Sequence, residues 1–294
     1  MRVPQCCHLA GAAILLFTMS VAAQVQSATR FDAVYVFGDS YCDVGNIFLA
    51  TQGAEPPAPY YNGRFSNGPI WVDHVAGFLG VPMQPSLVGG TDYAFGGAWV
   101  TAPQAIPGGT IPSVPQQVEL YLSQHGGKAD PAALYILEGG GNDILGTTSG
   151  TPDALGYQIA VGIAKSEWLL REAGARHFVI PNLFNVGLLP AAAGNVSFAT
   201  KASAATNKFV NQLLALEQLL QGVRIVRMDV FSLINAVETD PTHFGFTNIT
   251  DPCLTTTVCA DPDHTFFWDT HHPTEFGHSF FAVTLENALT AQTP

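Results

Sequence analysis

"VFGDSYCDVGN", Val36 to Asn46, places a glycine, an acid and a serine directly after an apolar run. The run, Ala33–Phe37, has the length and composition of a strand that is covered on both faces. Gly38, Asp39 and Ser40 then stand where such a strand ends. Taken alone, Ser40 is an ordinary turn residue, because serine often caps helices. Whether it is instead a nucleophile depends on what the rest of the chain brings to it.

Similar short runs recur along the chain and alternate with helical stretches. Strands are expected at Leu134–Glu138, His177–Pro181 and Val223–Met228, with a further short one near Asp92–Phe95. Helices are expected at Pro152–Glu172, Asn207–Gln221 and Pro273–Leu289. In the second helix, one buried face is predicted from the helical spacing of Phe209, Leu213, Leu216 and Leu220.

Strands that alternate with helices predict an α/β fold, with a three-layer, doubly wound and mostly parallel sheet. The strands of such a sheet end at one edge, and ligands bind outside that edge. The Pro- and Gly-rich stretches 51–69 and 100–115 are expected to be loops. Together with 240–266, they are expected to shape the binding pocket. Tyr60 is one of several aromatic residues there that either line a cleft or pin the loops to the core.

The beginning of the chain has the features of a secretory signal peptide. Arg2 supplies a positive charge, Leu9–Met19 is apolar, and Val21-Ala22-Ala23 offers a small-residue cleavage site. The alternative, an uncleaved anchor, is disfavoured because the apolar run is too short to span a bilayer. We therefore expect a signal peptide at 1–23 and a single secreted domain at 24–294, extracellular or periplasmic, without a transmembrane segment.

Charge and cysteine content narrow the choice of partners. The chain has 11 basic and 23 acidic residues and a net charge of −12. No basic cluster is present, so nucleic acid is not an expected partner, whereas neutral polymers, zwitterionic lipids and small esters remain open. In an exported chain, Cys253 and Cys259 are expected to form a disulfide, and Cys42 to be a small packed residue. The histidines and acids of 264–278 match no common zinc spacing, so no metal or cofactor is expected.

Residues with catalytic potential lie next to several predicted strands and before the last helix. They are the glycine-rich run 139–143, the glycine pair 96–97 and the Asp-Thr-His-His run 269–272. A serine hydroxyl needs a base to take its proton, and a histidine oriented by a carboxylate suits that task. The amides of Ser40 and of a glycine, with the side-chain amide of Asn142, would supply donors for an oxyanion.

Together these segments resemble the GDSL or SGNH hydrolases. FGDSYCDVGN, GRFSNGPIWVDHVA (63–76) and FWDTHHPT are similar to the secreted lipase/esterase and phospholipase/haemolysin-type branch. The resemblance covers most of the chain in the family's usual order. It implies a flavodoxin-like SGNH hydrolase fold and a secreted serine hydrolase that cleaves carboxylic esters or lipids through an acyl-enzyme. The natural ester and its acyl length stay open.

The resemblance also assigns roles to individual residues. Ser40 is expected to be the nucleophile, and Asp269 and His272 to complete the triad in the pattern Asp-x-x-His-Pro. His271 is then a neighbour of the base. The expected oxyanion donors are Ser40, Asn142 and a glycine of the pair, Gly97 being favoured over Gly96.

This sequence departs from the family pattern at Tyr41, where a leucine is usual. The change is expected to leave the chemistry intact and to reshape the acyl pocket. Asp39, Asp43 and Asp143 are expected to hold backbone amides and loops, and Glu138, which has no evident partner, to be structural. Two alternatives stay open: an acyltransferase that uses the same acyl-enzyme, and a catalytically weak surface-binding protein on the same fold.

Overall fold

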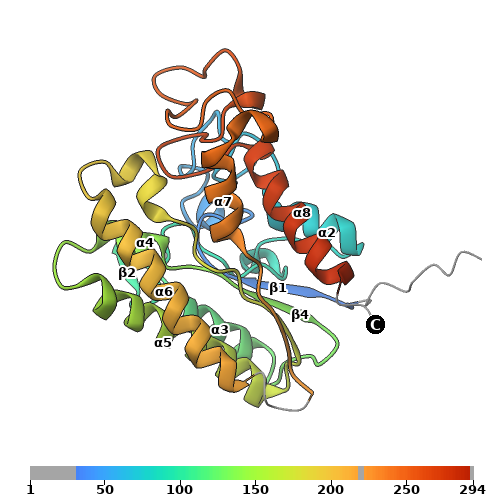
Figure 1. The fold of residues 1–294 in the computed structure, drawn as a ribbon. Coiled ribbons are helices and arrows are strands. Elements are labelled where there is room, and N and C mark those ends of the chain that lie inside the picture. Colours follow the sequence, from blue (N-terminus) through green and yellow to red (C-terminus); the bar gives the residue numbers. More distant parts are fainter. Residues whose placement is uncertain (1–30, 218–221, 292–294) are drawn as a thin grey trace, which may run out of the picture.

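A four-stranded parallel sheet forms the centre of the computed structural model, which describes residues 31–217 and 222–291, with the backbone alone for 216 and 217 (Figure 1). In spatial order the strands are β1 (Val34–Phe37), β4 (Leu134–Leu137), β5 (His177–Val179) and β6 (Arg224–Val226). Val34, Leu134, His177 and Arg224 lie opposite one another, so the four strands end at one edge. Every residue of β4 is buried, which explains why its run is apolar without alternation.

The short strand predicted near Asp92–Phe95 is reduced to two isolated parallel bridges, from Asp92 to Val36 and from Asp92 to Pro85. The amide of Tyr93 donates to the Val36 carbonyl at 2.7 Å. This segment therefore lies on the side of β1 that is away from β4, which gives the flavodoxin-like strand order. In that order the connections after β1 and β4 diverge, and the crevice between their carboxyl ends is the usual ligand site.

Helices cover both faces of the sheet and confirm the predicted doubly wound α/β fold. One face carries α3 (Val114–Gln124), α5 (Pro152–Ala173) and α6 (Val196–Glu217), and the other carries α2 (Trp71–Leu79) and α8 (Glu275–Ala291) (Figure 1). The remaining helices are α1 (Asn46–Ala50), α4 (Gly141–Gly146) and α7 (Val230–Thr239). The first two follow β1 and β4 closely and carry the chain away from the carboxyl edge.

Two predictions about individual segments need correction. The stretch 100–115 contains an antiparallel hairpin of β2 (Gln104–Ile106) and β3 (Gly109–Ile111). The helix expected at Asn207–Gln221 begins earlier, at Val196. Its buried face includes Val210 and Leu214, whereas the predicted Phe209 and Leu213 are half-buried. Residues 218–221 and the side chain of Leu216 lie outside the described residues, as does the predicted signal peptide at 1–23.

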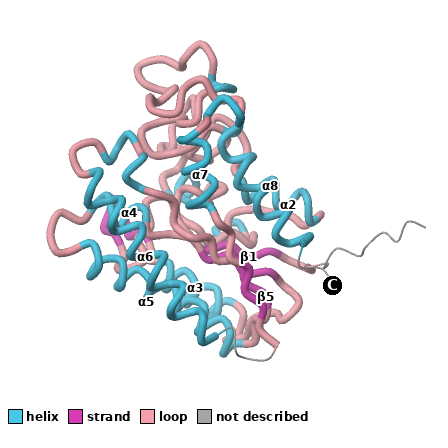
Figure 2. Tube along the Cα trace, in the orientation of Figure 1, coloured by secondary structure: helices cyan, strands magenta, loops and turns pink. Residues whose placement is uncertain are grey.

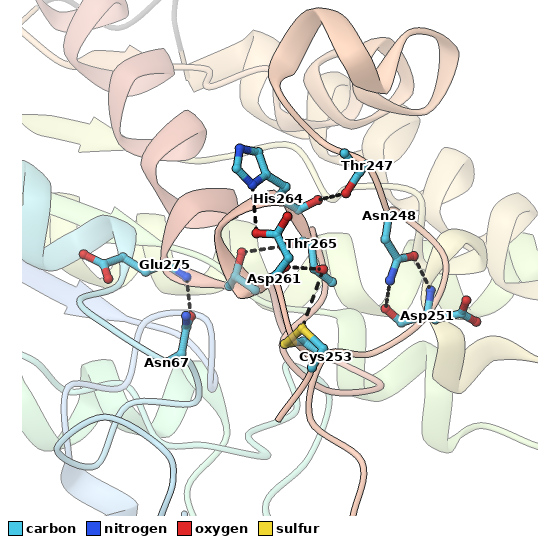
Figure 3. The surroundings of a disulfide bond; sticks show 11 residues. Asn67, Thr247, Asn248, Asp251, Cys253, Asp261, His264, Thr265 and Glu275 are labelled. Atoms are coloured by element: carbon cyan, nitrogen blue, oxygen red, sulfur yellow. Dashed lines mark hydrogen bonds and ion pairs between the residues drawn. A yellow bond between two sulfur atoms is a disulfide. The ribbon is translucent and has the colours of Figure 1, made fainter. Parts of the chain in front are cut away.

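Loops gather at one end of the molecule, beyond helices α7 and α8 (Figure 2). The predicted disulfide between Cys253 and Cys259 is formed in this region, and Thr265 lies against it, with 3.8 Å between its hydroxyl and the Cys259 sulfur (Figure 3). Cys42 is a buried free thiol, as expected. Among the helices described, none has the length and apolarity of a membrane span.

Candidate active site

The structure brings Ser40, Asp269 and His272 together at the carboxyl edge of the sheet. Ser40 Oγ lies 2.7 Å from His272 Nε2, and His272 Nδ1 lies 2.7 Å from Asp269 Oδ2. Ser40 and His272 are 6% and 9% exposed, so both rest largely out of water. The three side chains thus form one continuous hydrogen-bonded series.

A tight turn after β1 fixes the serine. The amides of Cys42 and Asp43 both donate to the Asp39 carbonyl at 3.0 Å, and the Tyr41 amide donates to Asp39 Oδ1 at 3.0 Å. The turn therefore closes around Ser40 and leaves its amide with no acceptor among the described residues. This free amide is suited to bind an anionic oxygen.

The histidine is carried by a loop that folds back on itself. The amide of Trp268 donates to the His272 carbonyl at 2.8 Å, and the amides of His271 and His272 donate to Asp269 Oδ1 at 2.6 and 2.8 Å. The Tyr41 hydroxyl, from the turn after β1, donates to the His271 carbonyl at 2.7 Å. The loop is thus tied directly to the segment that holds Ser40. His271 points its ring toward Thr270 and is a neighbour of His272 (Nδ1 to Thr270 Oγ1, 2.8 Å).

Tyr60 adds a contact that the sequence did not single out. Its hydroxyl donates to Asp269 Oδ2 at 2.6 Å, the same oxygen that meets His272. Burial alone would raise the pKa of Asp269, but the charge of His272 and the hydrogen bonds from His272 and Tyr60 hold it below its ordinary value. Asp269 is therefore held as a carboxylate. The sequence predicted only that Tyr60 lines a cleft or pins a loop, because a hydroxyl in an irregular loop has no characteristic spacing.

The two glycines of the pair differ in what their amides do. The Gly96 amide donates to Asp43 Oδ2 at 2.8 Å, whereas no acceptor in the described ranges receives the Gly97 amide. Gly97 is partly exposed and has a φ of +79°, a conformation that favours glycine. At Gly96 a Cβ would lie 2.4 Å from the ring of Phe65. The geometry thus leaves Gly97 available as a donor and gives Gly96 a packing role.

Asn142 lies near the start of α4, the helix that follows β4. Its Nδ2 is 3.2 Å from Asp39 Oδ2 and 3.1 Å from the Ala98 carbonyl. Asp143 accepts the amides of Val100 and Thr101 at 2.8 and 2.9 Å, so it joins this loop to the glycine segment. These bonds confirm that Asp143 holds loops, and they fix the Asn142 amide group beside Ser40.

Glu138 has the partner that the sequence failed to show. Its Oε2 accepts the Asp39 amide at 3.3 Å and lies 3.7 Å from the Cys42 sulfur. Burial, followed by the nearby charge of Asp39, raises the pKa of Glu138 well above its ordinary value, and burial raises the pKa of Asp39 to about 6. Burial and the charge of Asp39 therefore favour the neutral form of Glu138 under the serine turn.

A hollow of about 280 Å³, counting the open space at its mouth, lies over these groups. Its polar lining includes Ser40, Asn142 and His272, and its apolar lining includes Leu145, Phe184 and Leu189. Asp269 and Gly97 lie outside this lining. Within the described ranges, no three His, Cys, Asp or Glu side chains gather as a metal-binding group.

Comparison with known proteins identifies the family of this chain. Residues 34–284, most of the chain, match the family described as GDSL-like lipase/acylhydrolase. The thermolabile hemolysin of Vibrio parahaemolyticus is 27% identical over 283 residues, which cover 86% of this chain but only 62% of the hemolysin. The phosphatidylcholine-sterol acyltransferase of Aeromonas hydrophila is 29% identical over 243 residues, or 79% of this chain and 69% of the acyltransferase.

Solved structures share the fold at low sequence identity. The carbohydrate acetylesterase of Sinorhizobium meliloti aligns with a TM-score of 0.51 at 15% identity, over 88% of this chain and 98% of that chain. A lipolytic protein of the G-D-S-L family from Veillonella parvula aligns with the same TM-score, identity and coverage. The family match extends from β1 into α8 and so includes every segment of the site. The chain belongs to the GDSL-like lipase and acylhydrolase family of ester-bond hydrolases.

Proposed function

We propose that this chain is a serine hydrolase that cleaves carboxylic esters through an acyl-enzyme, with Ser40, His272 and Asp269 as its triad. The observation that supports this most is the unbroken series from Ser40 Oγ through both ring nitrogens of His272 to Asp269 Oδ2, at 2.7 Å for each step. A base in direct contact with the hydroxyl, and itself oriented by a carboxylate, is what activates a serine.

The reaction follows from these contacts. His272 Nε2 takes the proton of Ser40 as Oγ attacks the ester carbonyl, and Asp269 stabilises the imidazolium that forms. The oxyanion is bound by the amides of Ser40 and Gly97, and by the side-chain amide of Asn142 once one of its bonds to Asp39 and the Ala98 carbonyl is exchanged for the substrate oxygen. His272 then protonates the leaving alcohol. A water molecule repeats the sequence on the acyl-enzyme and releases the acid.

Two alternatives use the same fold. A relative from Aeromonas hydrophila is a phosphatidylcholine-sterol acyltransferase, and transfer of the acyl group to an alcohol would need no change in the triad. A relative from Arabidopsis thaliana, 27% identical over 282 residues, is an inactive GDSL esterase/lipase-like protein. The contact between Ser40 and His272 argues against an inactive binding role here. We favour hydrolysis.

We further infer that the chain is exported, with a signal peptide at 1–23 and one hydrolase domain at 24–294, and that its substrate is a neutral or zwitterionic ester or lipid. The disulfide between Cys253 and Cys259 supports an oxidising location. The net charge of −12 supports a substrate without negative charge.

The Ser40→Ala variant tests the reaction. Hydrolysis of p-nitrophenyl acetate should fall by several orders of magnitude, on the order of 10⁶ in kcat, while the far-UV circular dichroism stays that of the parent. A fluorophosphonate probe should label the parent once and leave this variant unlabelled. Ser123→Ala, at an exposed serine on α3, is the matched control and should behave as the parent. Hydrolysis by Ser40→Ala at the parent's rate would refute the proposal.

A further inference from the structure

A second hollow lies behind the catalytic pocket, at the same edge of the sheet. Its space is about 380 Å³, again counting the open mouth. Its apolar lining comes from Trp71 at the start of α2, Met228 and Val230 after β6, and Phe281 of α8. The two hollows share Tyr41 and Phe184 in their linings. These two residues therefore form the wall between them.

The wall is held rigidly. The rings of Tyr41 and Phe184 are stacked, with 5.1 Å between their centroids and 27° between their planes. They are only 9% and 8% exposed. On its far side Tyr41 stacks on Phe281 at 6.4 Å, and its hydroxyl is bound to the His271 carbonyl at 2.7 Å. A side chain with these contacts on three sides has little freedom to swing out of the way of a substrate.

The acyl group of a substrate must lie against this wall. The acyl group stays on Ser40 Oγ while the leaving alcohol departs with the proton of His272. The acyl chain therefore has to occupy the part of the pocket that the polar groups do not line. That part is apolar and is formed by Leu145, Phe184 and Leu189. An acyl chain that extends along it meets the stacked rings before it reaches the second hollow.

We propose that Tyr41 and Phe184 limit the length of the acyl group, and that the second hollow is an extension of the acyl site which this pair closes. The inference rests on the proposed ester hydrolysis and deepens it: the preferred substrates are esters of short acyl groups. Tyr41 stands where the family's name motif has leucine, so this wall includes a departure from the family pattern. Removing either ring joins the two hollows and admits longer chains.

The experiment compares kcat/KM for p-nitrophenyl acetate, butanoate and octanoate in the parent, Tyr41→Leu, Phe184→Ala and Tyr41→Phe. The parent should lose activity steeply from butanoate to octanoate. In Phe184→Ala and Tyr41→Leu, the ratio of octanoate to acetate activity should rise by about fourfold for each methylene that enters the second hollow. Tyr41→Phe keeps the ring and should keep the parent's ratio, which separates the wall from the hydrogen bond to His271.

Phe209→Ala, which truncates a half-buried aromatic residue on α6, is the control for a general loss of stability and should keep the parent's ratio. Tyr41 also anchors the loop that carries His272, through the His271 carbonyl. The Phe184→Ala variant tests the wall without removing that anchor. The inference is overturned if the parent already prefers octanoate, or if both ring deletions hydrolyse acetate with an unchanged ratio. If the parent cleaves no ester and takes up no fluorophosphonate, it is the proposed ester hydrolysis that fails.

Discussion

Tyr60 links an irregular loop to the triad through one short hydrogen bond. Among the described residues, its hydroxyl and His272 Nδ1 are the two groups that meet Asp269 Oδ2. A hydrogen bond to a charged group contributes about 1.5–3 kcal/mol, so its loss should be measurable in the rate. We infer that Tyr60 positions the carboxylate that orients His272.

The Tyr60→Phe variant should lower kcat by roughly tenfold or more, because Asp269 loses a donor that holds its charge and its orientation. KM for p-nitrophenyl acetate should change little, since Tyr60 is not part of the pocket lining. Tyr61→Phe, at the exposed neighbouring tyrosine, is the matched control and should retain the parent's kcat. An unchanged kcat in Tyr60→Phe would mean that the other bonds to Asp269 are sufficient.

Residues in short catalytic motifs were predictable, and residues that act through them were not. Ser40 and His272 stand in short motifs whose spacing reflects their chemistry, and the structure brings them to 2.7 Å. Tyr60 and Glu138 act through contacts with residues that are distant along the chain. Nothing in their local sequence indicates which side chains will face them, because this depends on how loops fold over the sheet.

At the level of elements, the long helix pair α5 and α6 shows where periodicity misleads. The first half of α6 buries the small residues Ala202, Ala205 and Thr206, and these allow α5 to approach closely at Gly156. An apolar stripe of large residues is absent from this half, so the pattern predicted the helix only from Asn207 onward. Strands β1 and β4 were predicted correctly because their apolar runs are buried almost throughout.

The Gly156→Ala variant should reduce the free energy of unfolding by about 1–3 kcal/mol, because the added Cβ would lie 2.6 Å from the Thr206 backbone nitrogen and force the helices apart. Urea unfolding monitored by circular dichroism measures this. Gly77→Ala, in the exposed part of α2, has no atom within 4 Å of the new Cβ and should be neutral or stabilising by up to about 1 kcal/mol. Equal effects at the two positions would contradict the close approach of α5 and α6.

Considered as a whole, the molecule keeps many of its acids inside, around the serine turn. Asp39, Asp43, Asp92 and Asp143 are buried, and the side chain of each accepts at least one backbone amide. Burial raises the pKa of each of them. The sequence predicted Asp39 and Asp43 as acceptors of backbone amides and Asp143 as the support of the loop that carries Asn142. The family resemblance implied the flavodoxin-like strand order. In the structure, this strand order places the four acids next to one crevice.

The Glu138→Gln variant tests this arrangement through the pH dependence of stability. A carboxyl whose folded pKa is raised contributes stability that is complete below its unfolded pKa of about 4.3 and is lost as the pH rises through the folded value. Glutamine keeps the shape and does not ionise. The free energy of unfolding of the Glu138→Gln variant minus that of the parent should therefore increase from about pH 5 to about pH 8.

Urea unfolding at the two pH values measures that difference. The control is Glu238→Gln, at an exposed position on α7. The difference in the free energy of unfolding between this variant and the parent should be the same at both pH values. A pH-independent difference for Glu138→Gln would show that Glu138 ionises normally in the folded chain.

The distance of 232 positions between Ser40 and His272 along the chain has a consequence for biosynthesis. A ribosome delivers the imidazole of His272 only after 232 further positions have followed the hydroxyl of Ser40. Until then the serine has no partner to withdraw its proton, and it is as unreactive as any other alcohol. The cell that makes this protein is therefore not exposed to its esterolytic chemistry from an unfinished copy, and activity begins only with completion of the fold.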